Sequence, residues 1–366
     1  MNSSTRAKIL KTLQIVATVY FFLLSIKLLG HSFQMFGEGF AESMIQMTSD
    51  PFAGLIIGIV ATSVIQSSST TTSIVVGLVA GNALSLANAI PIIMGANIGT
   101  TVTNTLVSMG HISNRIEFRR AFSAGVIHDL FNVCSVLVLF PLELKFHFIA
   151  RSALKMETLF AGAGGMKMFN PLKFVLNPVI SLVDKLISPL PYAPLILMIL
   201  SLVLLFAALT YLVRTIRSLM LSKLELIIND YLFRNDFLGF FLGILMTAIV
   251  QSSSVTTSLI IPLAGAGLIS LRQIFPYTLG ANIGTTVTAI LAALATGSEV
   301  AVTVAFSHLC FNIFGIFIFY PLRKIPIGLA SFIGNKAGKS TRNLIIFVCI
   351  YLMLYIIPLI AVIVHH

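Results

Sequence analysis

The stretch Gln66-Ser67-Ser68-Ser69 occurs a second time as Gln251-Ser252-Ser253-Ser254, and the sequence that follows it is repeated as well. Residues 66–103 align with residues 251–288 without a gap and share 20 identical residues among 38 positions. After a five-residue deletion, the matching positions are His128, Asn132 and Pro141 with His308, Asn312 and Pro321. A match of this length indicates an internal duplication. Each copy places hydroxyl and amide side chains inside apolar sequence.

The composition is that of a polytopic membrane protein. Hydrophobic residues make up 57% of the 366 residues, charged residues only 10%, and the mean hydropathy is +1.00. A soluble domain carries about 25% charged residues. The net charge of +11 does not indicate nucleic-acid binding, because the basic residues lie in short loops, as the positive-inside rule expects. The chain lacks a phosphate-binding Gly-Lys loop and metal-ligand spacing of its cysteines, which disfavours ATP-driven pumping and a structural metal.

The distribution of apolar segments and basic loops predicts an all-α membrane protein with a cytoplasmic N-terminus. The acidic segment 31–50 is expected outside and the basic segment 111–120 inside. The second repeat begins after a basic linker, so the two repeats are expected to have opposite orientations, as in many secondary transporters. Crossings are predicted at residues 12–30, 89–109, 121–140, 193–213, 273–296, 300–320 and 344–364.

Each repeat is predicted to contain a re-entrant helical hairpin and an interrupted crossing. The apolar run 52–65 spans about 21 Å as a helix, which is short of the roughly 30 Å hydrocarbon core. It leads into the serine turn, after which a second short apolar piece, 74–84, is expected to return to the same side. In repeat 2 the hairpin is predicted at 237–268. The glycines of segments 95–99 and 280–284 are expected to unwind the crossings that contain them, 89–109 and 273–296, near the middle.

These elements divide the chain into five parts. Residues 1–50 hold the first helix and an external segment, and 51–142 form repeat 1. A connecting region with one crossing and a cytoplasmic linker covers 143–236. Repeat 2 covers 237–322, and 323–366 hold a cytoplasmic loop and the last crossing.

The serine turns are expected to bind an anion. In repeat 1 the helix after the turn is predicted to begin at about Thr71, which places the serines at its N-cap and first turn, where amide groups and the helix dipole favour negative charge. Two facing turns would form a donor-rich cage without a nearby Lys or Arg. A multiply charged anion buried there needs compensation, which co-bound sodium would supply. The alternative is that these hydroxyls bond back to their own helices.

Other polar residues of the repeats are candidate ligands. Asn97, Thr100, Asn282 and Thr285 would be ligands at unwound crossings, whereas close helix packing is the alternative explanation of the adjacent glycines. Asp129 and Asn132 share one face of an apolar helix, and an intramembrane carboxylate is a functional candidate. Leu309 takes the place of Asp129 in repeat 2, so Asp129 would supply a sodium position in repeat 1 only; a structural Asp–His or Asp–Arg pair is the alternative. His128 and His308 are interpreted as packing or helix-end residues.

The motifs together resemble those of the type II sodium-dependent phosphate cotransporters. The likeness covers roughly residues 50–145 and 235–345 and includes both Gln-Ser-Ser-Ser segments, Gly95–Thr105, Glu117–Phe122, His128–Asn132 and Gly280–Leu294. It implies inorganic phosphate as substrate and sodium as the driving ion, with no cofactor and no enzymatic activity. It also matches Asp129 to the acidic position of electrogenic members, which implies three sodium ions per divalent phosphate. His111, Asn114 and Ala281 depart from residues found in some members at one sodium site.

The residues and the resemblance together predict a multi-pass plasma-membrane symporter, a bacterial inner-membrane protein, with alternating access at a central site. A homodimer with one pathway per protomer fits the resemblance. Three rivals stay open: a transporter of another oxyanion or a dicarboxylate, an ion channel, and an intramembrane serine hydrolase using His128 or His308. The predicted phosphate ligands are Gln66, Ser67, Ser68, Ser69, Gln251, Ser252, Ser253, Ser254, Asn97 and Asn282. The predicted sodium ligands are Asp129, Asn132, Thr100, Thr285, Asn312 and Asn114.

Overall fold

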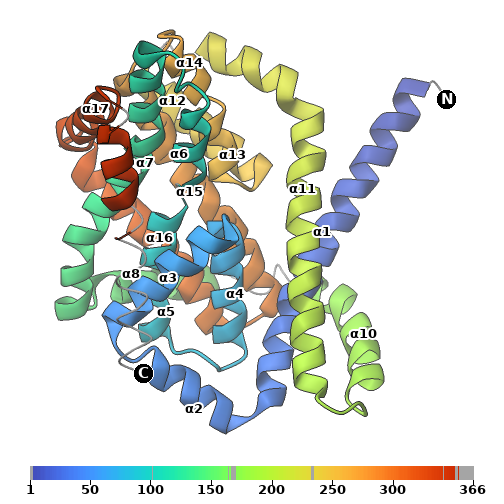
Figure 1. Ribbon diagram of the computed structural model, residues 1–366. Coiled ribbons are helices and arrows are strands. Elements are labelled where there is room, and N and C mark those ends of the chain that lie inside the picture. Colours follow the sequence, from blue (N-terminus) through green and yellow to red (C-terminus); the bar gives the residue numbers. More distant parts are fainter. Residues whose placement is uncertain are drawn as a thin grey trace.

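The computed structural model describes residues 3–100, 102–163, 165, 170–231, 235–340, 342–350 and 353. In these ranges the chain forms helices and no strand, which confirms the all-α prediction (Figure 1). Six spans are long and apolar enough to cross a membrane. They lie in α1 (Ser3–Phe36), α5 with α6 (Leu86–Gly99 and Val102–Met109), α7 (Arg115–Phe146), α11 (Ala193–Tyr231), α15 (Leu271–Thr296) and α16 (Glu299–Phe319).

These six spans contain the first six predicted crossings, because length and hydropathy alone define them. The seventh prediction, 344–364, falls largely outside the described residues. Residues 214–231 were predicted as part of a linker, but they continue α11 as helix. The predicted external segment also contains a helix, α2 (Glu38–Met47), which meets the next helix at 95°.

Each repeat folds into a helical hairpin whose turn is the Gln-Ser pair. In repeat 1, α3 (Pro51–Ile65) is followed by α4 (Ser68–Ala80). In repeat 2, α12 (Asp236–Val250) is followed by two short helices, α13 (Ser253–Ser258) and α14 (Ile261–Gly265). The helix after the first turn therefore begins at Ser68, three residues before the predicted Thr71, because the Ser67 side chain caps it.

The glycine segments are helical and pack helices together, so the predicted unwinding within 95–99 and 280–284 is wrong; the predicted interruption is present in repeat 1, directly after Gly99 between α5 and α6, and absent from α15. α5 remains helical to Gly99 and breaks only near Thr100, whereas α15 continues through the whole segment. A Cβ atom at Gly95 would overlap the carbonyl oxygen of Leu55 in α3, and one at Gly280 would overlap that of Phe240 in α12. The glycines thus let each hairpin lie backbone to backbone on its crossing, and the alternative interpretation is the right one.

This close packing extends the duplication upstream of the serine turns. Gly58 in α3 lies against the backbone of Ile92, and Gly243, its counterpart at the same spacing in α12, lies against that of Tyr277. The first arm of each hairpin is therefore part of the repeat. Its signal in the sequence is a sparse set of glycines and a shared threonine, Thr62 and Thr247.

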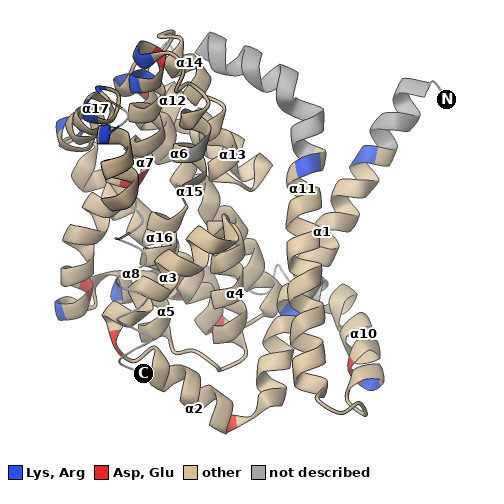
Figure 2. Cartoon of the chain, viewed as in Figure 1, with Lys and Arg blue, Asp and Glu red and all other residues tan. Residues whose placement is uncertain are grey.

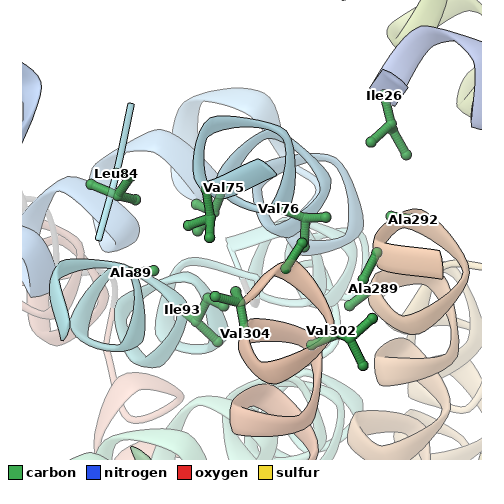
Figure 3. Packing of buried hydrophobic residues seen from close by; sticks show 14 of the residues in the cluster. Ile26, Val75, Val76, Leu84, Ala89, Ile93, Ala289, Ala292, Val302 and Val304 are labelled. Atoms are coloured by element: carbon green, nitrogen blue, oxygen red, sulfur yellow. The ribbon is translucent and has the colours of Figure 1, made fainter. Parts of the chain in front are cut away.

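The two repeats pack crosswise through the main hydrophobic core. α4 of repeat 1 lies against α15 and α16 of repeat 2, and α14 of repeat 2 lies against α7 of repeat 1. Figure 3 shows this cluster, in which Val75 and Val76 of α4 approach Ala289 and Ala292 of α15 and Val302 and Val304 of α16. In Figure 1, α3 to α5 occupy the lower half of the body and α12 to α14 the upper half. The serine turns lie between these two halves.

Three further described helices lie outside the two hairpins and the six spans, two in the connecting region and one in the segment predicted as a C-terminal loop. They are α8 (Phe148–Gly162), α10 (Asn170–Ile187) and α17 (Lys324–Ala337). Lys and Arg gather at the end of the molecule that carries α14, α17 and the start of α7 (Figure 2). The N-terminal end of α1 points toward the same end (Figure 1).

Candidate functional site

The two serine turns have nearly the same backbone geometry. Gln66 and Gln251 each adopt a left-handed conformation with φ 60°. Their backbone N–H groups donate to the carbonyl oxygens of Thr62 and Thr247, respectively, over 2.7 Å. This conformation ends one helix and points the chain into the next. The following residue caps the next helix: Ser67 Oγ accepts from the Thr70 amide over 3.2 Å, and Ser252 Oγ from the Val255 amide over 3.3 Å.

The two glutamine side chains fix each turn to its neighbouring helix in the same way. Thr103 Oγ1 donates to Gln66 Oε1 over 2.7 Å, and Thr288 Oγ1 donates to Gln251 Oε1 over 2.6 Å. The environments differ, because Gln66 is exposed and Gln251 is buried. Gln66 and Gln251 therefore hold the two turns in register with the crossings, and both turns are built as one repeated structure.

The two turns meet through hydroxyl-to-carbonyl bonds. Ser69 Oγ donates to the Gln251 carbonyl over 3.2 Å, and Ser254 Oγ donates to the Thr100 carbonyl over 3.0 Å. Ser69 and Ser254 occupy equivalent positions in the two repeats. The structure therefore brings the two serine motifs together, as two facing turns require.

A second polar layer connects the repeats through histidine and asparagine. His128 Nε2 is bonded to Asn282 Oδ1, and His308 Nε2 lies 3.3 Å from Asn97 Oδ1. Each pair joins the histidine of one repeat to the asparagine of the other. Asn132 lies between them, since its Nδ2 donates to the Asn97 carbonyl and its Oδ1 accepts from Asn282, each over 2.7 Å.

Ser68 and Ser253 differ from the other serines of the motifs. They lie in the first turns of α4 and α13, with 5% and 3% of their surface exposed. Neither hydroxyl has a hydrogen-bond partner among the described residues, whereas Ser67, Ser69, Ser252 and Ser254 all have one. Neither Oγ atom is among the fully buried oxygens without a partner, so both hydroxyls keep some accessible surface and can hydrogen-bond a ligand or water.

The surroundings of both turns carry no formal charge. The sequence has no Lys, Arg, Asp or Glu in residues 51–110 or 237–271. Several other buried oxygens in this region also lack a hydrogen-bond partner: Thr62 Oγ1, Thr72 Oγ1, Ser73 Oγ, Thr105 Oγ1 and, on α16, Asn312 Oδ1. The described residues hold no group of three His, Cys, Asp or Glu side chains that could bind a metal through charged ligands. These two segments would therefore offer an ion only neutral donors and acceptors, and Asp129 on α7 is the charged residue among the predicted ligands.

The predicted sodium ligands occupy different parts of the structure. Thr100 and Thr285 are buried, and their hydroxyls donate to the carbonyls of Ala96 and Ala281 over 2.9 Å. Asp129 is buried on α7 one turn before Asn132. Asn114 is exposed and caps α7, with its amide bonded to Glu117 over 2.9 Å. The hydrogen bonds of the Asn114 side chain thus join it to the start of α7 and not to the other predicted ligands.

Sequence reasoning missed several residues of the site. Asn104 and Thr257 exchange hydrogen bonds between the repeats over 2.8 and 3.2 Å, and Thr103 and Thr288 hold the glutamines. Thr103 and Thr288 could have been found from the sequence, because they are identical residues at aligned positions of the two repeats. Asn104 is aligned with Ala289, so no symmetry of the sequence points to it.

The fold and the site define a multi-pass helical membrane protein whose duplicated halves meet in a neutral, hydroxyl-rich centre. The family model described as Na+/Pi-cotransporter matches residues 21–168 and 204–357. The chain therefore belongs to the Na+/Pi-cotransporter family, which confirms the resemblance of its motifs.

Curated relatives cover nearly the whole chain. It is 35% identical over 426 residues to sodium-dependent phosphate transport protein 2A of Ovis aries, covering 94% of this chain and 66% of the relative. It is 33% identical over 439 residues to protein 2B of Homo sapiens, covering 93% of this chain and 63% of the relative. The chain thus spans about two thirds of these relatives' length. They are named as transport proteins and not as enzymes. No solved structure matches the chain.

Proposed function

We propose that this protein is a symporter that couples sodium entry to the uptake of inorganic phosphate. The observation that carries the proposal is the pair Ser68 and Ser253, two largely buried serines at equivalent helix starts whose hydroxyls have no hydrogen-bond partner among the described residues. Hydroxyls and first-turn amides at a helix start are donors for an oxyanion. The names of the relatives supply phosphate as that anion and sodium as the coupled ion.

Sodium is proposed because the site supplies no positive charge of its own. A divalent anion among neutral donors is stable only if cations enter with it. Asn312 Oδ1 and the hydroxyls of Thr72, Ser73 and Thr105 are buried oxygens without partners, and sodium prefers such hard oxygen ligands. Asp129 would add a charged ligand found in repeat 1 only. A stoichiometry of three sodium ions per divalent phosphate then moves net charge inward.

Alternating access is proposed to arise from two oppositely oriented hairpins around the shared centre. The hairpins lie toward opposite halves of the body in Figure 1, which supports opposite orientations. The basic end shown in Figure 2 is assigned to the cytoplasm of a cell whose plasma membrane holds the protein. Labelling with an impermeant thiol reagent in intact cells tests this assignment. Ser49→Cys, beyond α2, should react from outside, and Ser113→Cys, in the basic loop, should not.

The geometry does not favour a serine hydrolase. The Nε2 atoms of His128 and His308 face asparagine amides of the opposite repeat, and neither contacts a serine among the described residues. A general base must lie within hydrogen-bond reach of its nucleophile. Among the described residues, no serine hydroxyl is therefore hydrogen-bonded to His128 or His308.

The decisive experiment is radiolabelled phosphate uptake by the purified chain in liposomes. Uptake is expected with an inward sodium gradient and is expected to vanish when choline replaces sodium. Saturable uptake separates a symporter from a channel, and competition by arsenate, sulfate and succinate identifies the anion class. Equal uptake in sodium and in choline would contradict the proposed coupling.

A further inference from the structure

A hollow of about 400 Å³ lies at the basic end of the molecule, away from the serine turns. It is enclosed by the first turns of α7, the segment between α14 and α15, and one face of α17. Its lining residues are Ile116, Arg119, Arg120, Ser123, Ala264, Gly267, Ile269, Ser270, Leu271, Ser331 and Asn335. Its volume lies within the roughly 300–1,000 Å³ of small-molecule sites.

The hollow is positively charged and no acidic group neutralises it. Arg119 and Arg120 both line it, and none of its lining residues is acidic. The three ion pairs among the described residues involve neither arginine. Glu117, the nearest carboxylate along α7, is directed to Asn114 and His111, with contacts of 2.9 and 3.4 Å. Two exposed arginines therefore line one cavity, and neither has a carboxylate partner among the described residues.

The surrounding backbone and hydroxyls add to this character. Ser270 is the N-cap residue of α15, so the positive end of a 26-residue helix opens at the hollow. Gly267, with φ 77°, lies directly against the Arg120 guanidinium, and a Cβ atom there would overlap Arg120 Nη1. Absence of a side chain at Gly267 thus leaves room for Arg120 to lie over this loop. Ser331 and Asn335 supply further polar groups on the opposite wall.

We propose that this hollow is a second anion site, which binds a phosphate group at the basic end of the protein. Arginine matches phosphate oxygens with paired, charge-assisted hydrogen bonds. Two sources share this chemistry: the headgroup of an anionic phospholipid and free inorganic phosphate. The proposal is independent of transport, because it rests on a cavity that contains no residue of the serine turns.

The test uses the full chain and two double variants of equal charge. Arg119→Gln/Arg120→Gln removes both guanidinium groups of the hollow while keeping most of their aliphatic length. Arg115→Gln/Arg342→Gln removes two exposed arginines from outside the hollow. One arm measures the phosphatidylglycerol and phosphatidylcholine that remain bound, by native mass spectrometry. The other arm measures binding of radiolabelled phosphate by equilibrium dialysis in choline chloride without sodium.

The Arg119→Gln/Arg120→Gln variant is expected to bind about tenfold less phosphatidylglycerol or about tenfold less phosphate. Each charge-assisted bond contributes enough free energy to change affinity by roughly that factor. The control variant should bind like the wild type. Selective loss of phosphatidylglycerol identifies a lipid site, and selective loss of phosphate binding identifies a free-phosphate site. Equal binding by all three proteins, or equal loss in both variants, would overturn the proposal. Size-exclusion chromatography and the thermal midpoint verify that both variants fold.

Discussion

At the scale of single residues, the six serines of the two motifs divide into three structural roles. Ser67 and Ser252 cap helices, and Ser69 and Ser254 bond to carbonyls between the repeats. Ser68 and Ser253 alone have no protein partner among the described residues. The sequence predicts that these stretches cap helices, but three consecutive serines look alike in it. Their roles differ only through helix phase, since a helix turns about 100° per residue.

Ser68→Ala and Ser253→Ala are each expected to lower sodium-driven phosphate uptake by at least about tenfold, since each removes a hydrogen bond to a charged ligand. Stability should change by less than about 1 kcal/mol, because no protein bond is lost. Ser67→Ala is the control, and its lost cap should cost about 1 kcal/mol of stability. Uptake in liposomes and thermal midpoints in detergent measure both effects. Wild-type uptake in both variants would remove these hydroxyls from the site.

Asp129 is the residue expected to set the electrical behaviour of transport. Asp129→Gly should abolish the phosphate-evoked current and lower the sodium stoichiometry, because the proposed charged sodium ligand of repeat 1 would be lost. Asp129→Asn, which keeps the side chain's size and the helix, should have the same effect. Each charge moved across 100 mV contributes about 2.3 kcal/mol of driving force, so accumulation should become independent of voltage. A persisting current in both variants would refute the role of Asp129.

At the scale of helices, the crossings were predictable and the function of the glycines was not. Apolar length defines a membrane span without reference to any partner, and α7, α15 and α16 appear where hydropathy places them. Glycine is compatible both with unwinding and with close packing. Whether the helix unwinds or packs closely at Gly95 depends on how near α3 lies. No local sequence pattern predicts that distance. The hydrogen-bonded helix through Gly280 shows that packing prevails in repeat 2 as well.

Gly95→Ala should therefore destabilise the protein by about 1–3 kcal/mol or more, since its methyl group would overlap the Leu55 carbonyl oxygen and push α3 away from α5. Gly328→Ala on α17 is the matched control, because nothing lies within 4 Å of the added carbon. That change should leave stability equal or raise it by up to about 1 kcal/mol. Thermal unfolding in detergent compares the two. A neutral Gly95→Ala would contradict backbone-to-backbone packing of α3 and α5.

At the scale of the whole molecule, the duplication becomes a crosswise assembly. Each repeat's second hairpin arm packs against the other repeat, and each repeat's histidine bonds to the other's asparagine. The repeat was evident in the sequence, yet these contacts were not. The two histidine–asparagine contacts join residues that are 154 and 211 positions apart in the sequence. The sequence repeat shows which residues are equivalent, but it does not show which residues are in contact.

The crosswise pairing makes a measurable prediction about energetic coupling between the repeats. His128→Ala and Asn282→Ala should be non-additive, with a coupling energy of about 0.5–2 kcal/mol, as found for polar pairs between membrane helices. His308→Ala with Asn97→Ala should show the same sign. A cycle of His128→Ala with Asn343→Ala is the control, since Asn343 contacts Lys336 and not this layer. That cycle should be additive to within about 0.5 kcal/mol.

The quantity to measure is the free energy of unfolding of the wild type, the single variants and the double variant in one detergent. The two partners of each pair lie in different repeats. Their coupling energy therefore reports contact between the two halves and not the stability of either half alone. Additive losses at His128 and Asn282, matching those of the control cycle, would mean that this layer does not join the repeats. Coupling at both pairs would instead show that the two halves are held together by equivalent bonds, which join α7 to α15 and α16 to α5.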